Sequence, residues 1–130
     1  MNVLVIDGHG GGMGASLVRA IKEKLPDATV TAVGTNVAAT AAMKKAGADD
    51  SATGENAVVV CCRRADVIVG PVACVIADSL CGEITPAMAL AVGSAEARRI
   101  LVPFNRCDNI VVGVANLSSA ELIRLAAEQI

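Results

Sequence analysis

Apolar and polar positions along the chain follow two alternating periods. Short apolar runs rich in β-branched residues, each typical of a buried strand, occur at 2–7, 28–34, 66–71, 99–104 and 109–114. Residues 48–54 leave room only for a further short strand or a turn. Helical segments separate most of these runs. The pattern therefore predicts an α/β fold, a three-layer Rossmann-like domain with a mainly parallel sheet of five or six strands spanning residues 1–130.

The segments between the strands carry helical spacing and recognisable end signals. Asn36 and Thr85 have the side chains of N-caps, and Ser118-x-x-Glu121 has the form of a capping box. Residues 55–65 fit a strand or a helix, and we expect a helix because the next parallel strand requires a crossover. The helices are predicted at 14–25, 37–46, 55–65, 72–82, 86–93 and from 119 onward.

Composition excludes several classes of partner. The net charge is −2 and Phe104 is the one aromatic residue, so neither a polyanion patch nor the stacking faces that bind nucleic acid are expected. The longest apolar run, 67–77, is too short to span a membrane, and no basic region precedes the first apolar segment. Five cysteines without a C-x-x-C spacing favour reduced thiols and a cytoplasmic location.

A glycine-rich loop follows the first predicted strand and contains the one histidine of the chain. Ligands of parallel α/β sheets bind beyond the carboxyl ends of the strands, and the amides of a helix N-terminus attract anions. We therefore expect the phosphate of a nucleotide or dinucleotide here, with NAD or NADP as the candidate cofactor. Tight strand–helix packing is the alternative reason for the glycines. The loop comprises Asp7, Gly8, His9, Gly10, Gly11, Gly12, Met13 and Gly14.

The spacing of Gly8, Gly12 and Gly14 resembles the T-G-x-x-x-G-x-G motif of short-chain dehydrogenases. This resemblance covers about the first quarter of the chain and implies a dinucleotide pyrophosphate at the loop. The chain departs from that family in three ways. Asp7 replaces the threonine, the second strand ends in neutral residues where an acid would bind ribose, and the catalytic tyrosine is missing from a chain without tyrosine. A short-chain-dehydrogenase reaction is therefore excluded.

A second resemblance extends over the whole chain. The segments IDGHGGGMG, GTN, ATGENA, VGPVACVIADSLCGEITP and VPFNRC are similar to those of an uncharacterised family of short bacterial proteins, domain of unknown function 3842. This resemblance implies a single bacterial α/β domain and no particular reaction.

Further polar groups are expected at the same sheet edge. Strand exits contribute Thr35, Asn36, Gly70, Pro71, Asn105 and Arg106 as cofactor-binding candidates. A second hypothesis is a cofactor-independent enzyme acting on a small phosphorylated or carboxylated metabolite. In it, Cys107 is a nucleophile activated by His9, Glu83 is an acid or base, and Arg106 anchors the substrate.

No metal site is predicted, because His9, Cys107 and Asp7 do not form a local ligand motif. A third hypothesis is a non-enzymatic oligomeric module. The sparsely charged segments TAAMKKAGA and AMALAVGSA favour a homodimer or larger homo-oligomer, since an exposed apolar helix face is otherwise a liability.

Overall fold

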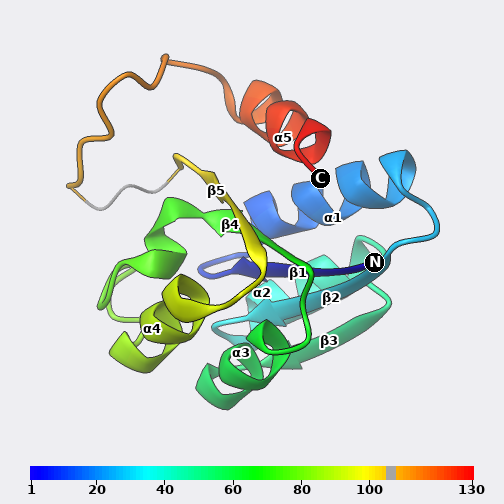
Figure 1. Cartoon of the computed structure of the whole chain (residues 1–130), viewed down its shortest axis with the longest axis horizontal. Helices are drawn as coiled ribbons and strands as arrows, with labels where there is room; N and C mark the ends of the chain where they lie inside the picture. Colours follow the sequence, from blue (N-terminus) through cyan, green and yellow to red (C-terminus); the bar gives the residue numbers. More distant parts are fainter. Residues whose placement is uncertain (105–107) are drawn as a thin grey trace.

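A five-stranded parallel sheet forms the centre of the molecule in the computed structural model, which describes residues 1–104 and 108–130 (Figure 1). The strand order is β3-β2-β1-β4-β5. The sheet therefore extends from β1 through β2 to β3 on one side. The chain then returns to the other side of β1, where β4 pairs with β1 and β5 pairs with β4. The predicted α/β class and parallel sheet are confirmed. The strands are β1 (Asn2–Asp7), β2 (Thr29–Gly34), β3 (Asp50–Thr53), β4 (Val67–Pro71) and β5 (Arg98–Val102).

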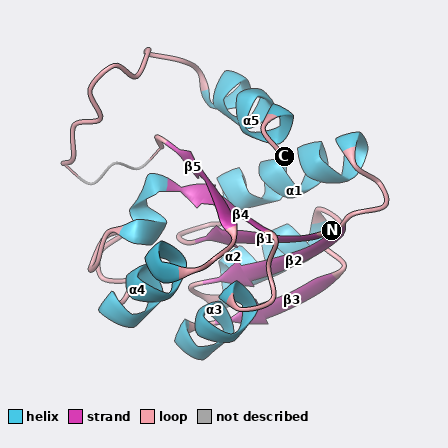
Figure 2. Cartoon of the chain, viewed as in Figure 1, coloured by secondary structure: helices cyan, strands magenta, loops and turns pink. Residues whose placement is uncertain are grey.

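Helices cover both faces of the sheet (Figure 2). The α-helices are α1 (Gly12–Lys24), α2 (Val37–Lys45), α3 (Glu55–Cys62), α4 (Pro86–Ser94) and α5 (Ser119–Glu128), and η1 (Val72–Val75) is a 3₁₀ turn. Asn36, Thr85 and Ser118 accept hydrogen bonds from Ala39, Met88 and Glu121 N–H groups, which confirms the three predicted caps.

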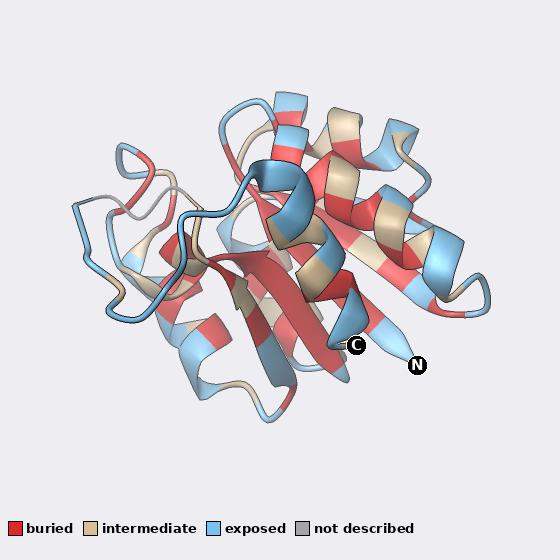
Figure 3. Cartoon of the chain, turned by 90° about the horizontal axis from the view of Figure 1, so that it is seen from above, coloured by how far each residue is buried: buried red, intermediate tan, exposed pale blue. Residues whose placement is uncertain are grey.

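Alternation along the strands divides the core into two layers. Val3 and Val5 of β1 pack in the layer that also contains side chains of α1, α2 and α5. Leu4 and Ile6 point to the opposite face, where they pack with side chains of α3 and α4. Figure 3 shows the buried positions concentrated in the strands and on the sheet-facing sides of the helices. The buried sheet thus holds the carboxyl ends of β1, β2 and β4 in a fixed relation.

The helix predicted over 72–82 is wrong. Only the single 3₁₀ turn η1 forms, and residues 76–85 then cross the carboxyl end of the sheet as consecutive turns. Ser79 Oγ donates to the carbonyl oxygens of Ala73 and Ile76 at 2.7 Å each. The hydroxyl bonds these carbonyls locally, and the β-branched run around Val75 lowers helix propensity. We call residues 76–85 the crossing segment.

The strand predicted over 109–114 is also absent. Ile110 and Val112 are 87% and 92% exposed, and this part of the chain is a loop between β5 and α5. A parallel neighbour for β5 requires a crossover of about a dozen residues or more, and 103–108 is shorter than that. The apolar pattern therefore has no pairing partner within its own chain.

Gly11 sets how closely α1 approaches α2. Its φ is +74°, and a Cβ there would lie 2.7 Å from Cα of Ala39. Gly47 also has a positive φ, +117°, but has open space around its Cβ position. An alanine at Gly47 would therefore introduce backbone strain alone, whereas an alanine at Gly11 would introduce both strain and steric overlap.

We predict that Gly11→Ala lowers the free energy of unfolding more than Gly47→Ala does. Both variants place alanine in a left-handed conformation, which costs roughly 1–2 kcal/mol. Gly11→Ala adds overlap with the α2 backbone, for a difference of about 1 kcal/mol or more. Urea denaturation followed by circular dichroism measures both values, and equal losses would contradict the packing role of Gly11.

Candidate functional site

The glycine-rich loop lies where the strand order reverses. Residues 8–11 connect β1 to α1 at the carboxyl end of the sheet, between the ends of β2 and β4. Asp7 is in register with Gly34, and the Thr35 N–H donates to the carbonyl oxygen of Asp7 at 3.0 Å. This is the edge at which open α/β sheets bind their ligands. The structure thus brings the first two strand exits together as the sequence predicts.

Asp7 provides the cap that α1 otherwise lacks. The N-cap residue of α1 is Gly11, which has no side chain to accept a helix amide. The buried Asp7 carboxylate substitutes for it: Oδ2 accepts from the Gly14 N–H at 2.7 Å and Oδ1 from the Gly8 N–H at 2.8 Å. An ionised carboxylate fits this arrangement because both oxygens act as acceptors. The negative charge therefore lies inside the loop, beneath the helix N-terminus.

The pKa of Asp7 reflects a competition between burial and hydrogen bonding. Burial raises the pKa above its usual value, because it penalises the charged form. The amides of Gly14 and Gly8 and the nearby His9 act in the opposite direction, and burial outweighs them. The negative charge of Glu83 adds to the upward shift.

Two amides of the first turn of α1 remain available. Gly12 and Met13 have no backbone or side-chain acceptor for their N–H groups within residues 1–104 and 108–130. Gly12 is exposed and no heavy atom lies within 4 Å of its Cβ position, and the same holds for Gly10. The Met13 side chain is buried in the core and presents only its backbone to this edge. Among the described residues, the unbonded amides of Gly12 and Met13 are the donors at this helix N-terminus for which an anion could compete, and of the two residues only Gly12 is exposed.

Glu83 joins the first two strand exits. Its Oε1 atom accepts hydrogen bonds from Thr35 Oγ1 at 2.5 Å, Asn36 Nδ2 at 2.7 Å and the His9 N–H at 3.0 Å. Asn36 Nδ2 also donates to the carbonyl oxygen of His9 at 2.8 Å. The crossing segment thereby supplies a carboxylate at the end of β2, where the sequence shows only neutral side chains.

The contacts of Glu83 hold it in its ionised form. Partial burial raises its pKa, but the hydrogen bonds from Thr35, Asn36 and the His9 N–H together lower the pKa below its usual value. Glu83 Oε2 lies 3.8 Å from His9 Nδ1, within ion-pair distance when the imidazole is protonated. Glu83 is therefore ionised at neutral pH and suited to accept hydrogen bonds.

The backbone around Glu83 has an unusual conformation. Asp78, Leu80 and Cys81 have φ values of +64°, +55° and +55°, and Gly82 has +87°. Such values cost energy in residues other than glycine, so the surrounding contacts must hold them. This path brings Leu80 over the loop: its Cδ1 atom would lie 2.9 Å from a Cβ at Gly8. Sequence analysis missed Leu80, because a predicted helix over 72–82 places it elsewhere.

The other predicted site residues differ in accessibility. Gly70 and Pro71 are buried at the end of β4, and a Cβ at Gly70 would lie 2.6 Å from the carbonyl oxygen of Ile6. Packing against β1 explains that glycine. Asn105, Arg106 and Cys107 lie outside the described residues.

Residues 1–104 and 108–130 contain neither a candidate membrane span nor a candidate metal cluster. No helix in these ranges has the length and apolar character to cross a bilayer. In the same ranges, no three His, Cys, Asp or Glu side chains converge as a metal site would require.

Comparison with known proteins identifies a family and a structural likeness. A family model described as a domain of unknown function, DUF3842, matches residues 2–130. No curated protein matches the chain. Among solved structures, a dodecameric FMN-dependent UbiX-like decarboxylase from Escherichia coli O157:H7 is 19% identical with a TM-score of 0.46. That match covers 99% of this chain and 75% of the other. The whole-chain family resemblance seen in the sequence is confirmed.

We predict a pH-dependent stabilisation by Glu83. Because folding lowers its pKa from the usual 4.5, the ionised side chain stabilises the fold above that pH and loses this effect as the pH falls through 4.5 and below. At pH 7, Glu83→Gln should lower the free energy of unfolding by about 1 kcal/mol. Denaturation at a series of pH values measures the difference from wild type, which should shrink toward acid.

Glu23→Gln is the matched control, because Glu23 is exposed and has no ion pair or side-chain hydrogen bond with another described residue. Its effect should be near zero at every pH. A Glu83→Gln effect that stays constant from neutral to acid pH would contradict the role of the charge.

Proposed function

The chain belongs to the DUF3842 family, and we propose that it binds a dinucleotide through its pyrophosphate at the first turn of α1. One observation carries this proposal: Gly10 and Gly12 have open space at their Cβ positions, whereas Gly8, Gly11 and Gly14 are tightly packed. Strand–helix packing accounts for the three packed glycines and leaves the other two unexplained. A ligand lying against the backbone accounts for them, because a Cβ would hold it away from the amides.

The charge of Asp7 supports a diester over a terminal phosphate. The carboxylate already binds two amides beneath the helix N-terminus, so it offsets the partial positive charge there. A terminal phosphate carries about −1.5 to −2 at neutral pH, whereas each phosphate of a dinucleotide pyrophosphate carries one charge. Where one phosphate of the pyrophosphate lies at the helix N-terminus and the other lies farther away, the repulsion from Asp7 is therefore smaller than for a terminal phosphate. The N–H groups of Gly12 and Met13 would be its donors.

Glu83 supports NAD over NADP. Dinucleotide-binding sheets commonly place an acid near the end of β2 to accept the ribose hydroxyls. Glu83 Oε1 is held by three donors at that position, and Oε2 has no hydrogen bond to a described residue. Oε2 could accept a ribose hydroxyl, whereas the extra phosphate of NADP would meet a like charge.

We predict that Gly12→Val abolishes stabilisation by NAD. No heavy atom of the described residues lies within 4 Å of the Gly12 Cβ position, so we expect the isopropyl group to shield the neighbouring amides from a ligand with little packing cost to the protein. Thermal unfolding of wild type should shift upward with millimolar NAD, and more than with AMP or inorganic phosphate. Gly93→Val is the control, because Gly93 is also an exposed helical glycine with open space and lies in α4. Gly93→Val should show the same upward shift of the unfolding midpoint with NAD as wild type. A wild type whose unfolding midpoint does not change with NAD, NADP or ATP would contradict the proposal.

The second prediction concerns the choice between NAD and NADP. In wild type, the dissociation constant for NADP should exceed that for NAD by about tenfold or more, equivalent to about 1.4 kcal/mol of repulsion. Glu83→Gln removes the charge and should bring the ratio toward one, while Glu23→Gln should leave it unchanged. Isothermal titration calorimetry measures both constants. A ratio that Glu83→Gln does not change would show that Glu83 does not face the ribose.

A further inference from the structure

Helix α4 has an apolar surface on its exposed side as well as its buried side. Its nine residues include no charged side chain. Met88, Ala89 and Val92 pack into the core, while Leu90 on the outer side is 70% exposed. A helix that is apolar around its whole circumference is typical of a helix buried on every side. In a single copy of the chain, the apolar outer side of α4 is therefore exposed to water, which its sequence does not suit.

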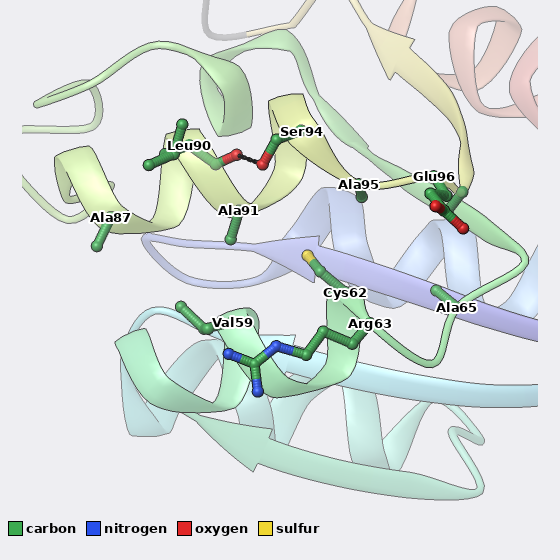
Figure 4. Close-up of a pocket in the computed structure, with 11 residues that line it drawn as sticks. Val59, Cys62, Arg63, Ala65, Ala87, Leu90, Ala91, Ser94, Ala95 and Glu96 are labelled. Atoms are coloured by element: carbon green, nitrogen blue, oxygen red, sulfur yellow. Dashed lines mark hydrogen bonds between the residues drawn. The ribbon is translucent and has the colours of Figure 1, made fainter.

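A groove of about 620 Å³ lies between this exposed side and α3. Figure 4 shows Val59 and Cys62 of α3 on one wall and Ala87 and Ala91 of α4 on the other. Leu90 lines the same groove and is the largest apolar side chain of α4 that is exposed. The surface thus combines one projecting apolar side chain with a hollow bordered by small ones.

Two charged side chains also line the groove, and they have opposite signs. Arg63 and Glu96 are both exposed and have no ion-pair partner within residues 1–104 and 108–130. Opposite charges on one surface make that surface complementary to a copy of itself. A partner of a single charge sign would be repelled by one of the two.

We propose that the α3–α4 groove is the contact surface of a homodimer in which Leu90 of each protomer fills the groove of the other. A two-fold interface uses the same surface from both partners, so the projection and the hollow must lie on one face. The α3–α4 face meets this requirement. Small side chains along α4 allow the two helices to approach closely, and Arg63 of each protomer can meet Glu96 of the other.

The interface and the glycine-loop site meet at the N-terminus of α4. Thr85 caps α4 and follows Glu83 closely in the crossing segment. Thr85 Oγ1 also donates to Glu55 Oε1 at 2.6 Å, which ties the start of α4 to the start of α3. Dimerisation would therefore anchor both helices next to the segment that carries Glu83. The dimer itself does not depend on any ligand at the loop.

Sedimentation of the full chain with Leu90→Glu tests the contact. Wild type should be a dimer at micromolar concentration, and Leu90→Glu should raise the dissociation constant by about 30-fold or more. Val37→Glu is the matched control, because Val37 is a 75% exposed apolar residue at the start of α2 on the other face. Val37→Glu should have the same dimer dissociation constant as wild type. A monomeric wild type, or equal effects of the two substitutions, would overturn the proposal.

A charge exchange separates a specific contact from loss of folding. Arg63→Glu and Glu96→Arg should each weaken the dimer, and the double variant should restore it. Circular dichroism establishes that each variant is folded. Failure of the double variant to recover would overturn the Arg63–Glu96 contact. Binding of an apolar fluorescent dye to a monomeric wild type, lost in Leu90→Glu, would overturn the dimer and assign the groove to a small apolar ligand.

Discussion

The placement of one buried carboxylate determines the geometry of the carboxyl end of this sheet. Asp7 ends β1 and holds the amides of Gly8 and Gly14, so the loop must turn back over its own strand before α1 begins. Gly14 has to be glycine for the same reason, because a Cβ there would lie 2.7 Å from the Asp7 Cβ. The carboxylate replaces a conventional N-cap and leaves the amides of Gly12 and Met13 without an acceptor among the described residues.

A second carboxylate determines how the neighbouring strand exits are held together. Glu83 reaches the ends of β1 and β2 from the crossing segment and collects three donors on one oxygen. The two acids respond differently to their surroundings. Burial outweighs the hydrogen bonds at Asp7 and raises its pKa, whereas at Glu83 the three hydrogen bonds together outweigh burial and lower its pKa. The site therefore has one buried carboxylate, beneath the N-terminus of α1, and one more accessible carboxylate that accepts hydrogen bonds.

Local patterns were sufficient to predict most of the fold and insufficient for the part that completes the site. The caps at Asn36 and Thr85 and the parallel strands follow from short-range signals, and the structure confirms them. The crossing segment depends instead on tertiary contacts. Ser79 bonds to two carbonyls, and Leu80 takes a left-handed conformation that no local propensity favours. The apolar run at 109–114 had strand propensity but no strand to pair with, because pairing is a property of the fold.

The glycines of the loop have two possible reasons, packing and ligand binding, and composition alone does not decide between them. From the sequence alone, packing and ligand binding both explain them, since both require a backbone without side chains, and the number of glycines favours a ligand. The structure separates the two reasons residue by residue. Gly8 and Gly11 would collide with Thr35 and Ala39 if they carried a Cβ, so packing alone requires them. At Gly12 no such collision exists, and an exposed glycine in the first turn of a helix weakens that helix. A partner that must reach the amides is the explanation that we propose for Gly12.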